Sequence, residues 1–130
     1  MAGSTVHMTA GRNCSLQEIH ERIHYIEDAE LISKTAQSIN DVTIWTLVYE
    51  KYYFRVGSYT SATIVLTEYG QEQTACVVAS GGGAGIVNNS FGANKKFAKE
   101  CVCALKSCGF CVVESDLDMK GKGLVERFLK

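Results

Sequence analysis

The stretch Val42-Thr43-Ile44-Trp45-Thr46-Leu47-Val48-Tyr49 decides the fold, because it is dense in the β-branched and aromatic residues that favour strands. Gly57-Ser58 marks a turn after it, and a second long strand is predicted over Tyr59–Thr67. Another turn at Tyr69–Gln71 leads into a third strand, Gln73–Ala79. Short connections between long strands favour hairpins over parallel crossovers, so this part of the chain predicts an antiparallel meander.

Upstream of the meander, the pattern predicts a strand and a helix. Thr5–Ala10 forms a short first strand bounded by Gly11. Ser15-Leu16-Gln17-Glu18 is a capping box, in which the serine hydroxyl and the glutamate carboxylate satisfy free N–H groups at a helix start. One apolar stripe follows at helical spacing, formed by Leu16, Ile19, Ile23 and Ile26. Residues 29–39 alternate between types and predict an irregular strand.

Downstream, a second helix and a short strand are expected. Four residues, Phe97, Cys101, Leu105 and Cys108, recur at helical spacing. Gly109 stands where a glycine ends a helix. Phe110–Val113 predicts a short apolar strand, and Leu124–Leu129 predicts a terminal helical turn.

The element order is therefore β-α-β-β-β-β-α with a short β tail. An antiparallel sheet with two helices on one face buries both helix stripes, which predicts a two-layer α+β sandwich. This order matches the TATA-binding-protein-like arrangement, and a helix-grip fold is the alternative. At 130 residues the chain is expected to form one domain, with a core over about 5–114 and a C-terminal extension over 115–130.

Composition narrows the function classes. A net charge of −1 argues against nucleic-acid binding, which needs a basic surface. No apolar run reaches the length of a membrane span of about 18 residues. The N-terminus lacks a basic region followed by an apolar one, so we expect a cytoplasmic protein whose six cysteines are reduced.

Three segments carry a family resemblance: Val48–Tyr52, Ser80–Gly82 and Asn89–Gly92. Together they resemble a family of small uncharacterised bacterial proteins, mainly Gram-positive, with a VYERY-like strand and an SGG segment. The resemblance covers Thr5–Phe110, and Ala93-Asn94 stands where the family has an acidic pair. It implies a fold and no activity.

The sharpest chemical motif is His20-Glu21-Arg22-Ile23-His24, a literal H-E-x-x-H. In zinc peptidases the two histidines bind the metal and the glutamate is the general base. The third ligand here would be Glu30, although Glu27 replaces the glycine of the extended motif. A helical projection places His20 about 80° and His24 about 120° from the centre of the apolar stripe, which predicts that both point to solvent.

A cysteine cluster, Cys101-x-Cys103 followed by Cys108 and Cys111, is the second candidate. Residues two apart on a helix point in nearly opposite directions, so Cys101 and Cys103 cannot share a metal. The C-x-x-C pair formed by Cys108 and Cys111 closes a helix, whereas redox pairs open one. We therefore expect buried free thiols that pack as small hydrophobes.

The third candidate is Ser80-Gly81-Gly82-Gly83-Ala84-Gly85, between the strands and the second helix. It lacks the spacing of both common phosphate loops, since residue 86 is Ile86. Lys95, Lys96 and Lys99 are expected in the first turns of the following helix, where the dipole disfavours cations. Together these features predict an anion pocket, formed by Ser80, Gly81, Gly82, Gly83, Gly85, Lys95 and Lys96.

Two functions remain open at this stage. The first is a non-enzymatic module without cofactor that binds a small anionic ligand or associates with itself as a homodimer. Its recognition surface would include an open sheet face around Tyr49, Tyr53 and Tyr59. The alternative is a small zinc-dependent hydrolase built on His20, His24 and Glu30, with Glu21 as the base.

Overall fold

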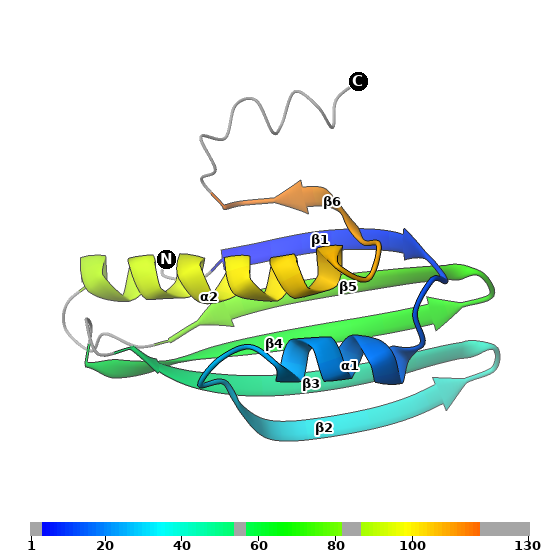
Figure 1. Ribbon diagram of the computed structural model, residues 1–130, viewed down its shortest axis with the longest axis horizontal. Helices are drawn as coiled ribbons and strands as arrows, with labels where there is room; N and C mark the ends of the chain where they lie inside the picture. The colour runs from blue at the N-terminus through cyan, green and yellow to red at the C-terminus, as the bar shows by residue number, and fades with distance from the viewer. Residues whose placement is uncertain (1–3, 54–56, 82–86, 118–130) are drawn as a thin grey trace.

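The computed structural model describes residues 4–53, 57–81 and 87–117, which form six strands and two helices (Figure 1). For residues 87–91 it describes the backbone alone. The predicted turn at Leu124–Leu129 lies outside the described residues. In chain order the elements are β1 (Ser4–Gly11), α1 (Leu16–His24), β2 (Glu30–Ile39), β3 (Val42–Tyr53), β4 (Ser58–Tyr69), β5 (Glu72–Ser80), α2 (Val87–Lys106) and β6 (Cys111–Ser115).

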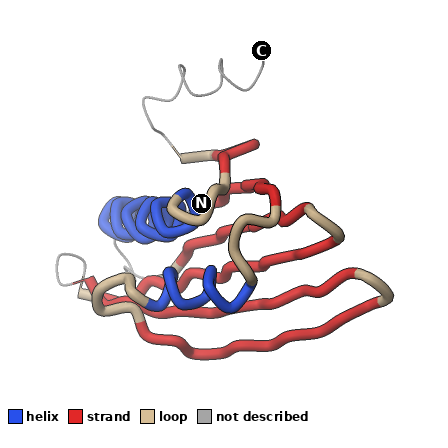
Figure 2. Tube along the Cα trace, turned by 45° about the vertical axis from the view of Figure 1, so that its right-hand side comes forward, coloured by secondary structure: helices blue, strands red, loops and turns tan. Residues whose placement is uncertain are grey.

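All six strands belong to one antiparallel sheet with the order β2-β3-β4-β5-β1-β6. Strands β3, β4 and β5 form the predicted meander, β2 extends it at its β3 edge, and the first strand inserts between β5 and β6. Figures 1 and 2 show both helices on the same face of the sheet. The predicted two-layer α+β sandwich and its element order are confirmed.

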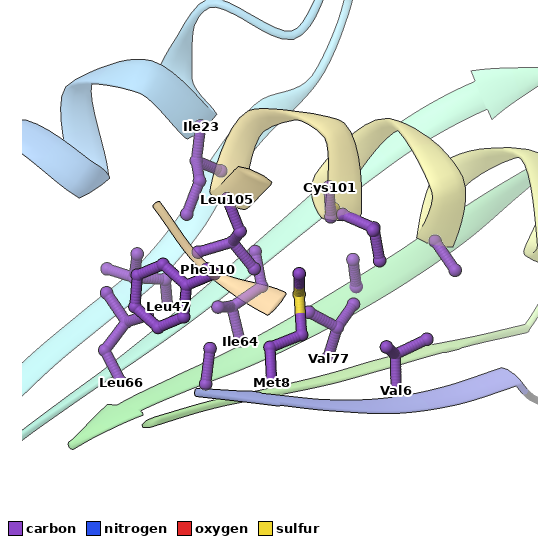
Figure 3. Close-up of a cluster of buried hydrophobic side chains, with 14 of the residues drawn as sticks. Val6, Met8, Ile23, Leu47, Ile64, Leu66, Val77, Cys101, Leu105 and Phe110 are labelled. Carbon is purple, nitrogen blue, oxygen red and sulfur yellow. The ribbon is translucent and has the colours of Figure 1, made fainter. Parts of the chain in front are cut away.

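The hydrophobic core lies between this sheet face and the two helices (Figure 3). Alternate residues of the central strands point into it, such as Ile64 and Leu66 of β4 and Val77 of β5. Both predicted helix stripes are buried here, except for Ile26, which lies beyond the end of α1 and is partly buried. The buried stripe residues are Leu16, Ile19, Ile23, Phe97, Cys101, Leu105 and Cys108.

Local signals in the sequence set the helix ends. The Ser15 hydroxyl accepts the backbone N–H of Glu18 at 3.1 Å, and the Glu18 carboxylate accepts the backbone N–H of Ser15 at 2.8 Å. This is the predicted capping box. At the C-terminal end of α2, Gly109 has φ +94° and its N–H bonds to the Lys106 carbonyl. The Phe110 N–H bonds to the Leu105 carbonyl. That pair of bonds is a Schellman motif with glycine at C′.

Two features differ in detail from simple patterns. The predicted irregularity of the second strand is a register shift between Leu31 and Ser33 in the β2–β3 pairing. Helix α2 begins at Val87, eight residues before Lys95, so the expectation that Lys95 and Lys96 lie in its first turns is wrong.

Neither helix is long and apolar enough to cross a membrane, as far as the chain is described.

Candidate functional site

The histidine pair of the H-E-x-x-H motif lies between α1 and strand β3. The imidazole rings of His20 and His24 are 5.8 Å apart, because residues four apart on a helix stand one turn above each other. The His20 ring is 6.3 Å from the Trp45 ring and 6.4 Å from the Tyr49 ring. Nδ1 of His24 is 3.3 Å from the Tyr49 hydroxyl. The pair is thus held against the helix-facing side of the sheet.

His20 is the unusual member of the pair. Both of its ring nitrogens are buried, and neither has a hydrogen-bond partner within the described residues. Its pKa is lowered from the ordinary value of 6.5, first by burial and then by the positive charges of Lys34 and His24, with Glu21 opposing them. Buried polar atoms normally have a hydrogen-bond partner, so an imidazole whose two nitrogens both lack one needs an explanation.

A hollow of about 420 Å³ opens beside the pair. Its walls are exposed or half-exposed side chains on one side of α1 and just after it, namely Gln17, His20, Glu21, His24 and Tyr25. Nearby, Nζ of Lys34 lies 4.3 Å from the centre of the Trp45 ring, which is a cation–π contact. The hollow itself is lined by two imidazoles, a carboxylate, an amide and a phenol ring, and the Lys34–Trp45 contact lies beside His20 outside the lining.

The structure corrects the predicted orientation of the histidines. His24 is exposed as expected, but His20 is only partly exposed and its nitrogens are buried. Within the described ranges, no group of three His, Cys, Asp or Glu side chains could hold a metal ion, so Glu30 does not join the pair as a third ligand.

The structure describes only part of the predicted anion pocket at the glycine segment. Ser80 ends β5, and Gly81 follows with φ +103°. Gly82, Gly83 and Gly85 lie outside the described residues. Since Lys95 and Lys96 lie in the middle of α2, the helix dipole argument does not apply to them. Lys96 instead lines a separate hollow of about 320 Å³, together with Ile26, Glu27, Lys99, Glu100 and Cys103.

The tyrosines expected on the open sheet face divide between the two faces. Tyr49 is fully buried and points toward the helices, so its assignment to the open face is wrong. Tyr53 is on the same side, with its ring 6.3 Å from that of Phe97. Of the three, Tyr59 alone lies on the open face, where its ring is 5.1 Å from that of Tyr52.

The cysteine cluster is likewise split. Cys101 and Cys108 are buried as predicted, and burial raises the pKa of Cys101 to about 12. Cys103 and Cys111 are exposed, so the expectation of buried thiols is wrong for these two. The prediction that Cys101 and Cys103 point apart is confirmed by their opposite exposure.

Sequence reasoning missed the sheet residues that surround the histidine pair, Lys34 and Trp45. The alternation along each strand was the available signal, since it places Trp45 and Tyr49 on one face. Lys34 reaches that face because it pairs with Leu47, and this pairing depends on the register shift earlier in β2.

Fold and site together define a two-layer α+β protein with a helix-borne histidine pair packed on its sheet. A family of unknown function (DUF6054) matches residues 1–109. The match covers most of the chain, so the chain belongs to this family. It ends just before β6. No curated protein matches the chain.

Proposed function

We propose that this protein is a non-catalytic binding module whose ligand is a small anion, carrying a carboxylate or a phosphate, held in the hollow beside His20. The observation that carries the proposal is the pair of buried, unpartnered nitrogens of His20 next to that hollow. Rotation of the imidazole turns a nitrogen toward the hollow that the ring already lines. An anionic oxygen there supplies the missing hydrogen bond.

The electrostatics of the hollow favour an anion. Lys34 and His24 both lower the pKa of His20, so positive charge converges on this ring. The one opposing carboxylate, Glu21, accepts a hydrogen bond of 3.3 Å from the Gln17 amide. A bound anion relieves the repulsion among the three basic groups and lets His20 carry a proton.

The test uses inorganic phosphate and acetate as probes, with thermal unfolding and backbone amide NMR shifts of α1 as readouts at low ionic strength. Both variants His20→Gln and Lys34→Gln should weaken binding about tenfold, since a hydrogen bond to a charged group is worth about 1.5–3 kcal/mol. Lys106→Gln, an exposed lysine at the end of α2, is the matched control and should bind as the wild type does. Silence toward both anions, or binding that survives both site variants, overturns the proposal.

A zinc-dependent hydrolase is the second candidate, because the literal motif does bring His20 and His24 to 5.8 Å. The described residues supply no third ligand, which favours the binding module. Zinc titration of the same samples separates the two: stoichiometric, tight zinc uptake with hydrolysis of an ester or peptide substrate supports the enzyme.

A bacterial, mainly Gram-positive origin and a cytoplasmic location remain part of this proposal.

A further inference from the structure

No described element covers the sheet face opposite the helices (Figure 2). The strand registers place alternate residues on it, as in the row formed by Thr46, Val65 and Cys76. Six of the eight large hydrophobic side chains exposed in the described ranges lie on this face: Ile39, Tyr52, Tyr59, Tyr69, Val78 and Val113. A concentration of exposed apolar side chains on one face points to an interaction surface.

The charge on this face is sparse and peripheral. Both lysines of the described strands, Lys34 and Lys51, lie on the helix-facing side, and the open face carries the imidazole of His7 on β1. The open face carries four carboxylates, and each is near a border: Glu30 at the start of the edge strand β2, Glu50 near the end of β3, Glu72 at the start of β5, and Glu114 on the edge strand β6. The middle of the face holds no lysine, arginine or carboxylate, so it meets an identical face without repulsion between these groups.

The face has the size that a stable dimer needs. Six strands spaced about 4.8 Å apart and about nine residues long give a footprint of roughly 700 Å². A standard interface buries about 800 Å² on each partner. Face-to-face packing of two sheets at about 10 Å is also a common way for sheets to bury an apolar side.

We propose that a second copy of this chain covers the open sheet face, so that two sheets pack against each other with the helices outside. This inference is independent of the proposed anion site, which lies on the helix-facing side. A two-fold interface is self-complementary, so its axis passes near the middle of the patch. That point lies between the central strands β4 and β5, where Val65 pairs with Cys76. The thiols of the two Cys76 residues are therefore buried near the axis.

The first experiment measures the mass of the full chain in solution by sedimentation or light scattering over a range of concentrations. A dimer of twice the 14.2 kDa chain mass is expected. A wild-type protein that remains monomeric up to about 100 µM, well above the Kd of a typical specific complex, overturns the proposal.

The second experiment locates the interface with matched strand variants. Thr63→Lys adds a charge to the middle of the open face, where Thr63 pairs with Val78. Ser38→Lys adds the same charge at an exposed strand position on the helix-facing side. The first variant should be a folded monomer and the second a dimer, with circular dichroism reporting the fold. A dimer that persists with Thr63→Lys overturns the face-to-face arrangement.

Thiol labelling gives a readout that does not depend on any variant. Cys103 is exposed on α2, outside the proposed interface, and serves as the internal control. Labelling of Cys76 should slow at least about tenfold on going from dilute to concentrated protein, as the dimer forms, while labelling of Cys103 keeps its rate. Equal concentration dependence for the two thiols overturns the proposal, including the case in which Thr63→Lys fails to fold.

Discussion

The ammonium group of Lys51 lies 2.8 Å from the Glu100 carboxylate, which joins the end of β3 to the middle of α2. Lys51 is only 9% exposed, whereas the Glu100 side chain keeps 30% of its surface in solvent. The Tyr53 hydroxyl donates a second hydrogen bond to the same carboxylate oxygen at 3.3 Å, and burial raises the pKa of Tyr53. The pair is therefore asymmetric, with a buried cation and a partly hydrated anion.

This asymmetry predicts different costs for removing the two partners. Glu100→Leu leaves a buried ammonium without its anion and should lower the free energy of unfolding by about 2–3 kcal/mol. Lys51→Met removes the buried charge while Glu100 keeps Tyr53 and water, so its cost should stay below about 1.5 kcal/mol. Urea unfolding measures both. Equal losses would show that the pair contributes through attraction alone.

The same substitution should have opposite effects at two glycines. Gly92 lies inside α2 with open space around it, so Gly92→Ala should stabilise the protein by about 0.5–1 kcal/mol. Gly109 has φ +94°, and a Cβ there would lie 2.6 Å from the Asn13 side-chain nitrogen. Gly109→Ala should therefore destabilise by about 1–2 kcal/mol. Thermal unfolding midpoints that move in the same direction for both variants would contradict this reading.

The N-cap of α1 should stabilise the protein, because it fixes the start of the helix that carries His20 and His24. Ser15→Ala removes the hydroxyl that accepts the Glu18 N–H and should cost about 1 kcal/mol. Ser15→Asp keeps an acceptor and should retain most of the stability. Urea denaturation compares the stability of the three proteins. An alanine variant as stable as the wild type would show that the Ser15 cap does not stabilise the protein.

His20 makes stability depend on pH in a defined direction. Its folded pKa lies below 6.5, so the unfolded chain binds its proton first as the pH falls. The contribution is fully present above pH 6.5 and is lost as the pH falls through that value toward the folded pKa. The groups that face the ring are Lys34 from β2, Tyr49 from β3, and His24 and Glu21 from α1.

The measurement compares the wild type with His20→Gln between about pH 7.5 and about pH 5, a range that spans histidine titration. The unfolding midpoint of the wild type should fall further than that of the variant over this range. Parallel curves for the two proteins would mean that His20 titrates alike in the folded and unfolded chains.

Local patterns in the sequence were sufficient for the element order. The density of β-branched and aromatic residues in Val42–Tyr49 and the capping box at Ser15 are signals from residues close in the chain, and the strand and the helix start that they predict are both confirmed. The start of α2 was misplaced because the apolar stripe begins at Phe97, where the helix covers the sheet, whereas the helix itself begins at Val87.

The candidate site depended on relations between strands, and a linear pattern does not contain these. His20 and His24 were found from their motif, but their setting comes from Trp45 and Tyr49 on β3 and Lys34 on β2. The shift between Leu31 and Ser33 determines which β2 residues face the helices. A slip of one residue would turn Lys34 to the opposite face and remove it from the site.

The position of β1 in the sheet has a consequence for how the chain folds. This strand is made first, yet its hydrogen-bonded neighbours are β5 and β6, so its pairs join residues such as Val6 with Val77 and His7 with Glu114. The β2–β5 meander assembles from neighbouring segments, but β1 has no strand partner until residues 72–80 are synthesised. Such long-range pairing slows folding. Closure of the sheet by β1 is therefore a late event, and during synthesis β1 itself stays unpaired and open to pairing with other chains until β5 is made.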